Sequence, residues 1–139
     1  MAIPEKSLGE LGELRFCANA LERGIVVNTP FGDNSAYDCI TEHNGLLRRV
    51  QVKASATPDM FGRNKGNYWG FHISRGTSRK RPYEGGDFDV LVAYIIPHDI
   101  TFIIPSDELL THVSCKLSLN MRSDSKWAKY REAWTHLMV

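Results

Sequence analysis

The chain has 139 residues and a mass of 15.7 kDa, which is enough for one domain with a hydrophobic core, and we expect residues 1–139 to form a single domain. Hydrophobic residues make up 42% of it, and no apolar run approaches the roughly 20 residues of a membrane-spanning helix, so the composition argues against wholesale disorder and against a membrane protein. The net charge of +1 does not by itself indicate a nucleic-acid partner, and the odd count of three distant cysteines without a secretion signal predicts a reducing cytoplasm.

The first predicted element is a helix from Ser7 to Arg23. Ser7 and Glu10 form the S-x-x-E pattern of a capping box, and Gly24 stands where a C-terminal cap glycine is expected. The apolar residues of this segment fall on one broad arc of the helix: Leu11, Leu14, Phe16, Cys17, Ala18, Ala20 and Leu21. Glu10 and Glu13 fall inside the same arc, where a carboxylate costs desolvation free energy unless a partner satisfies it. We favour the capping role for Glu10, and either glutamate could supply a carboxylate to a site on a neighbouring sheet.

A short strand over Ile25–Val27 and a turn-rich segment precede a predicted β-hairpin. Its strands run over 37–43 and 46–54, and Asn44-Gly45 between them is the strongest short-range hairpin signal, because a type I′ turn needs positive φ at both central residues. A two-residue loop pairs His43 with Leu46, so the numbers of paired residues sum to 89.

Further strands are expected over 68–74, 88–96 and 100–104, the last two joined by Pro97-His98-Asp99. A short helix is expected to begin at Ser106. The final element, over 125–138, carries a stripe with the spacing of a helix, and we expect these residues to be core: Trp127, Tyr130, Trp134 and Leu137. Helix, strands and helix in this order predict an α/β or α+β sandwich.

The hairpin register gathers three polar side chains on one face. Asp38 lies directly across the ladder from Gln51, and Lys53 follows two residues later on the same face. Fold stability does not require a carboxylate, an amide and an ammonium in one place. Oxygen ligands from Asp38, Gln51 and a backbone carbonyl suit Mg²⁺, and a lysine beside the metal favours hydrolytic chemistry. The alternative is an exposed Asp38–Lys53 ion pair worth about 0–1 kcal/mol.

These residues resemble the PD-(D/E)xK nuclease superfamily. Within it, Gly12-Glu13, the run from Pro30 to Asp38 and the string Val50-Gln51-Val52-Lys53-Ala54 are similar to the Q-x-K branch, which includes bacterial group I intron homing endonucleases. The resemblance covers residues 8–55 well and the segment 88–109 more loosely. It implies a restriction-endonuclease-like α/β core, in which a mixed, mainly antiparallel sheet is flanked by an N-terminal and a C-terminal helix.

The resemblance also implies the roles of the site residues. Glu13, rather than Glu10, becomes the helix carboxylate, Asp38 the central metal ligand and Lys53 the catalytic lysine, with Mg²⁺ as cofactor. Gln51 occupies the usual acidic position, and the carbonyl of Val52 completes the ligands. A neutral Gln51 leaves the site one charge short, which favours one metal ion over two.

Basic charge is concentrated in one block. Residues 60–83 contain no acidic residue and six basic ones: Arg63, Lys65, Arg75, Arg79, Lys80 and Arg81. We expect these side chains to contact DNA phosphates, the alternative being a solvated loop, and we expect Trp69 and Phe71 within the block to pack in the core.

The favoured function is a homing-type endonuclease for double-stranded DNA in a bacterial, phage or organellar host. A chain of this size reads only a few base pairs, so a long site predicts a homodimer or homotetramer. One alternative is a Holliday-junction resolvase or a restriction- or repair-type nuclease on the same core. Another is a DNA-binding protein on an inactive nuclease fold, for which Gln51 is the reason.

Overall fold

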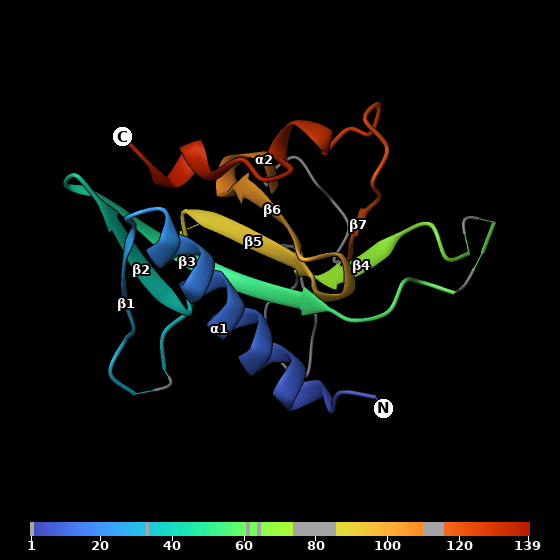
Figure 1. Ribbon diagram of the computed structural model, residues 1–139, viewed down its shortest axis with the longest axis horizontal. Coiled ribbons are helices and arrows are strands. Elements are labelled where there is room, and N and C mark those ends of the chain that lie inside the picture. Colours follow the sequence, from blue (N-terminus) through green and yellow to red (C-terminus); the bar gives the residue numbers. More distant parts are fainter. Residues whose placement is uncertain (1, 33, 61, 64, 74–85, 110–115) are drawn as a thin grey trace.

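A five-stranded sheet with one helix across its face forms the centre of the computed structural model, which describes residues 2–32, 34–60, 62–63, 65–73, 86–109 and 116–139 (Figure 1). The sheet has the order β1-β2-β3-β5-β6, with these bounds: β1 Val26–Asn28, β2 Cys39–His43, β3 Leu46–Ser55, β5 Val90–Ile95 and β6 Ile100–Pro105. All neighbours are antiparallel except β3 and β5, which are parallel. The predicted mixed, mainly antiparallel sheet of an α/β fold is therefore confirmed.

Helix α1 spans Glu5–Glu22, and it begins two residues earlier than predicted. Pro4 precedes its first turn and no side chain caps it, so the capping box assigned to Ser7 and Glu10 is wrong. The predicted C-terminal glycine is confirmed. Gly24 has a φ of 76° and donates to the Leu21 carbonyl, while Ile25 donates to that of Ala20, which together make a Schellman motif.

The hairpin forms with the predicted register. β2 and β3 pair from His43 and Leu46 to Cys39 and Val50, so paired numbers sum to 89 throughout. Asn44 and Gly45 have φ values of 50° and 86°, as a type I′ turn requires.

The two faces of the sheet support two separate cores. On one face α1 packs against β3 and β5, with Phe16, Val50 and Val92 fully buried. On the other face lie Leu91 and Ala93 of β5, covered by a second sheet of two antiparallel strands, β4 (Trp69–His72) and β7 (Lys116–Leu119). Successive side chains of β3 and β5 therefore point alternately to the first core and to the second core.

One part of the basic block, residues 69–73, contributes to the second core. The strand predicted over 68–74 is present as β4, and Trp69 and Phe71 are core residues as expected, being 6% and 2% exposed. Its partner β7 was not predicted from the sequence.

The segment predicted as a C-terminal helix is two short 3-10 turns, η2 (Ala128–Tyr130) and η3 (Trp134–Leu137). Between them Glu132 has a φ of 52°, and its carboxylate accepts hydrogen bonds from the amide and hydroxyl of Thr101. This break lets the chain pass from one face to the other: Trp127 and Tyr130 join the second core, whereas Trp134 stacks on Phe16 of the first. The stripe is buried as predicted, but not as one helix.

The connection between β5 and β6 is the 3-10 turn η1 (Ile96–His98), and the predicted short helix after β6 is α2 (Ser106–Leu109). Within the described part of the chain, no helix combines the length and the apolar character needed to cross a membrane.

Candidate active site

The sheet has a fork where β2 begins. β2 covers the edge of β3 only as far as Val50, while β3 continues for five more residues to Ser55. The edge of β3 beyond Val50 is therefore not paired by β2, and Asp38 lies at its start. The Asp38 amide donates to the Val50 carbonyl at 2.8 Å, which fixes the chain at this point.

The carboxylate of Asp38 is held by two donors from β3. Its Oδ2 accepts hydrogen bonds from the Val52 amide at 2.7 Å and from the Gln51 side-chain amide at 3.0 Å. The neighbouring placement of Asp38 and Gln51, predicted from the hairpin register, is thus what the structure shows. A carboxylate that accepts a main-chain N–H has one orientation fixed by the sheet rather than by its own rotamer.

Glu13 reaches Asp38 because α1 crosses β3 at Gly12. A Cβ atom on Gly12 would lie 2.6 Å from the Cβ of Ala54, so only glycine allows this approach. Burial, together with a hydrogen bond to Asp38 and the negative charges of Asp38 and Glu10, raises the pKa of Glu13 to about 7. Without a cation, the Glu13 carboxyl therefore keeps its proton to a higher pH than an ordinary glutamate and hydrogen-bonds to Asp38. Glu13, and not Glu10, is the glutamate that hydrogen-bonds to Asp38.

Lys53 lies on the same strand face as Gln51. It is half-buried and is the parallel-ladder partner of Ala93 in the second core, so the Gln51 and Lys53 side chains leave the sheet on the face opposite α1. Glu13 arrives from the α1 face. The fork is the place where groups from both faces can meet, since no β2 backbone separates them there.

The donor set at the fork fits Mg²⁺. It offers the carboxylates of Glu13 and Asp38, the amide of Gln51 and the carbonyl of Val52, which points to the open edge because the N–H of the same residue does so. In the described ranges no three His, Cys, Asp or Glu side chains are grouped as metal ligands. Two neighbouring carboxyl groups, of which Glu13 has a raised pKa beside the charge of Asp38, are groups whose negative charge a divalent cation would balance. The Gln51 nitrogen faces Asp38, so its oxygen is not the atom turned toward that carboxylate.

Cys39 follows Asp38 directly but is not a candidate nucleophile. Burial, together with the nearby Cys17, Asp38 and Glu13, raises the pKa of its thiol to about 12. The thiolate is the reactive form, so this cysteine acts as a small core side chain.

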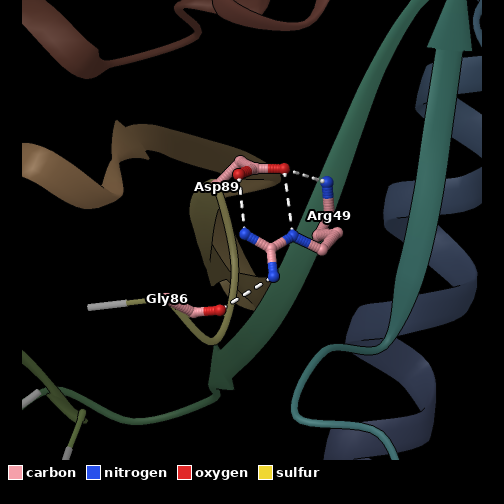
Figure 2. A network of polar contacts seen from close by, with 3 residues as sticks. All are labelled: Arg49, Gly86 and Asp89. Atoms are coloured by element: carbon pink, nitrogen blue, oxygen red, sulfur yellow. Dashed lines mark hydrogen bonds and ion pairs between the residues drawn. The ribbon is translucent and has the colours of Figure 1, made fainter. Parts of the chain in front are cut away.

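The predicted DNA-binding residues are only partly described. Arg63 and Lys65 are exposed, whereas Arg75, Arg79, Lys80 and Arg81 lie outside the described residues. The described chain resumes at Gly86, and Arg49 of β3 fixes it there (Figure 2). The Arg49 guanidinium donates to the Gly86 carbonyl at 2.8 Å and to Asp89 Oδ1 at 3.0 Å, and the Arg49 amide donates to Asp89 Oδ2 at 2.8 Å.

This Arg49 network was not anticipated from the sequence. Burial alone would raise the pKa of Asp89, but the hydrogen bonds and charge of Arg49 hold it below its usual value. The contact joins residues 40 apart through the parallel β3–β5 pairing, so no local pattern signals it.

Two comparisons place this geometry among known proteins. A family model described as "PD-(D/E)XK endonuclease" matches residues 3–137. The solved structure of a bacterial homing endonuclease superposes with a TM-score of 0.77 at 28% sequence identity, covering 94% of this chain and 90% of that one. A search of curated proteins found no match. The resemblance inferred from the sequence motifs and the restriction-endonuclease-like fold are both confirmed.

Proposed function

Because this chain belongs to the PD-(D/E)XK endonuclease family, we propose that it is a magnesium-dependent enzyme that hydrolyses phosphodiester bonds at a specific site in double-stranded DNA. The observation that carries the proposal is the hydrogen-bonded Glu13–Asp38 pair at the fork of the sheet, where two carboxyl groups from different elements lie beside each other and offer their oxygens to a cation. We propose the whole chain, residues 1–139, as one nuclease domain.

Each residue of the fork has a role in this proposal. Asp38 is the central metal ligand, and its two hydrogen bonds from Val52 and Gln51 keep it in one orientation. Glu13 supplies the second carboxylate and the Val52 carbonyl a third oxygen. Gln51 completes the ligands if its oxygen turns inward, and otherwise serves by orienting Asp38. When bound, Mg²⁺ would neutralise charge on the scissile phosphate and make the attacking water more acidic.

Lys53 is the proposed catalytic lysine. Lys53 is half-buried as a residue and lies two positions from Gln51 on the same strand face, so its ammonium is suited to orient the attacking water or to stabilise the negative charge that develops on the phosphate. With two carboxylates in place of three, one Mg²⁺ per site balances the charge, and we propose that number.

The homing-type assignment rests on the structural neighbour, which is a bacterial homing endonuclease matching nearly the whole of both chains. A chain of 139 residues contacts only a few base pairs, so a long target site requires a homodimer or homotetramer. The exposed Arg63 and Lys65 suit contact with the DNA backbone, and we propose that role for all six basic residues of the block. The free thiols of Cys17 and Cys39 suit a reducing cytoplasm.

Two other functions share this fold. A junction resolvase or a restriction- or repair-type nuclease would use the same residues on a different DNA shape. A DNA-binding protein that has lost catalysis is the third candidate, and the neutral Gln51 is the feature that favours it.

The test is cleavage of DNA in Mg²⁺ by the wild-type protein, with supercoiled plasmid, linear duplex and four-way junctions as substrates. Selection on randomised duplex DNA would then give the target site. We expect cutting of duplex at a defined sequence and no cutting in EDTA. Preference for junctions would favour the resolvase, and binding without cleavage of any DNA form in Mg²⁺ or Mn²⁺ would leave only the binding protein.

A further inference from the structure

Within the described part of the chain, Phe31 is the one Phe, Tyr or Trp side chain that the fold leaves exposed. Its relative exposure is 109%, whereas the other phenylalanines in the described part of the chain, Phe16, Phe71, Phe88 and Phe102, are at most 7% exposed. A phenylalanine in full contact with water forgoes the free energy that its burial would contribute, so it adds nothing to the stability of this fold.

The loop that carries Phe31 starts and ends at the active-site end of the sheet. It leaves β1 at Asn28, which pairs with Ile40 of β2, and it returns at Asp38, whose carboxylate is bound to β3 at the fork. Figure 1 shows this loop projecting from the sheet beyond the ends of β1 and β2. Phe31 is thus connected through a short stretch of chain to Asp38, the proposed metal ligand.

The backbone on both sides of Phe31 is restricted to particular conformations. Pro30 fixes its own φ, and Gly32 has a φ of 86°, a conformation that side-chain-bearing residues rarely adopt. Phe31 stands between them. A side chain presented on a preformed turn loses less conformational entropy when it binds than one on a flexible chain.

Distance limits what Phe31 can touch. Phe31 and Asp38 are seven positions apart in the chain, so their two Cα atoms are at most about 25 Å apart. If the phosphate to be cleaved lies at Asp38, about seven base-pair steps of 3.4 Å fit within about 25 Å of it along the duplex. A duplex cut at the fork therefore occupies part of the region that Phe31 can reach, whereas nothing requires a protein partner to lie there.

We propose that Phe31 inserts as an apolar wedge between base pairs of the bound DNA, from the minor groove, within a few steps of the cleaved bond. Apolar side chains of this size that enter the minor groove partly unstack one step and bend the duplex. The inference rests on the proposed function, because it takes DNA as the substrate at the fork. It adds that this enzyme distorts its target and that part of its specificity comes from the deformability of the wedged step.

The experiment uses duplexes that carry the selected cleavage site with 2-aminopurine at successive positions, with Ca²⁺ in place of Mg²⁺ to keep the complex uncut. Wild-type protein should raise the fluorescence at one or two adjacent positions, which marks unstacking. Phe31→Ala should abolish that rise and weaken DNA binding about tenfold or more, while Phe31→Trp should retain both. Thermal unfolding of Phe31→Ala should match wild type because the side chain is exposed.

Leu47→Ala is the matched control, since Leu47 is also an exposed apolar residue, 60% exposed, at the hairpin-turn end of β3. It should leave fluorescence, affinity and cleavage unchanged. Equal fluorescence and affinity for Phe31→Ala and wild type would overturn the inference while the nuclease proposal stands. A change in oligomeric state on Phe31→Ala, with unstacking retained, would overturn it in favour of a contact between copies. Wild-type protein that neither binds nor cuts DNA would remove both proposals.

Discussion

Replacing Gly12 with alanine tests how the packing of α1 on β3 controls the site. The new Cβ would lie 2.6 Å from the Cβ of Ala54, and an ordinary contact between carbon atoms is about 3.5–4.0 Å, so α1 must move away from β3 by about 1 Å. Overpacking of this kind costs about 1–3 kcal/mol, while the better helix propensity of alanine returns about 1 kcal/mol. The free energy of unfolding should therefore fall by about 0–2 kcal/mol.

Activity should fall much more than stability. Glu13 follows Gly12 directly, so the same shift moves its carboxylate relative to Asp38, and a displacement of about 1 Å in an active site costs on the order of 10²-fold in rate. Urea denaturation gives the stability, and single-turnover cleavage of the selected duplex gives the rate.

Gly9→Ala is the control for this experiment. Gly9 lies in the same helix with no atom near its would-be Cβ, so alanine there should raise stability by about 0.5–1 kcal/mol and leave cleavage unchanged. If Gly12→Ala behaves like Gly9→Ala in both assays, the close contact between α1 and β3 does not position Glu13, and the reasoning is refuted.

Three further changes have defined outcomes. The pKa of Glu13 is about 7 in the folded chain, against an ordinary value of 4.5. The protonated Glu13 therefore contributes fully to the stability of the metal-free protein below about pH 4.5, and this contribution is lost as the pH rises through 7. Urea titrations from pH 5 to 8 should show the loss of stability, and Glu13→Gln should remove this pH dependence. Arg49→Ala removes the hydrogen bonds from the guanidinium to Gly86 and Asp89. Because the Arg49–Asp89 ion pair is partly exposed, the free energy of unfolding should fall by only about 1 kcal/mol. An unchanged urea midpoint would show that this network does not fix the segment at Gly86. Gly45→Ala places a side chain on a residue with a φ of 86°, so the free energy of unfolding, measured by heat or urea, should fall by about 1–2 kcal/mol. This change is opposite in sign to that of Gly9→Ala. A gain in stability would contradict the type I′ turn.

The local parts of the fold and of the site were predictable because short-range chemistry determines them. Asn44-Gly45 sets the turn, the turn sets the register, and the register places Asp38 beside Gln51. The choice of Glu13 over Glu10 came from the family resemblance of Gly12-Glu13 and not from local chemistry. The structure shows a hydrogen bond between Glu13 and Asp38 and the close approach of α1 to β3 at Gly12 that permits it.

Other features depend on partners distant in sequence, and periodicity could not give them. The apolar arc of α1 included Leu14 and Leu21, yet these are 68% and 61% exposed, because the sheet covers only the narrow row of Gly12, Phe16 and Ala20. Helix propensity and capping patterns describe one element at a time, whereas burial is decided by the surface that the element meets.

The C-terminal segment shows the same limit. Its stripe predicted burial correctly, but Glu132 breaks the helix by turning its carboxylate to Thr101, on a strand 31 residues earlier in the chain. The parallel β3–β5 pairing and the β4–β7 sheet are also long-range. The Arg49 network could not be predicted for the same reason, because it joins Arg49 to Gly86 and Asp89, which are distant in sequence.

The central claim, that Asp38 at the fork holds a divalent metal for DNA cleavage, is tested most directly by Asp38→Asn. Asparagine keeps an oxygen that can accept from the Val52 amide but removes the charge, so the fold should persist. Calorimetric titration with Mn²⁺ should give one site per wild-type chain and none for the variant, and cleavage of the selected duplex in Mg²⁺ should fall at least on the order of 10²-fold. Asp107→Asn, the same change at an exposed carboxylate on α2, should match wild type in both. Wild-type metal binding and cleavage by Asp38→Asn would contradict the claim.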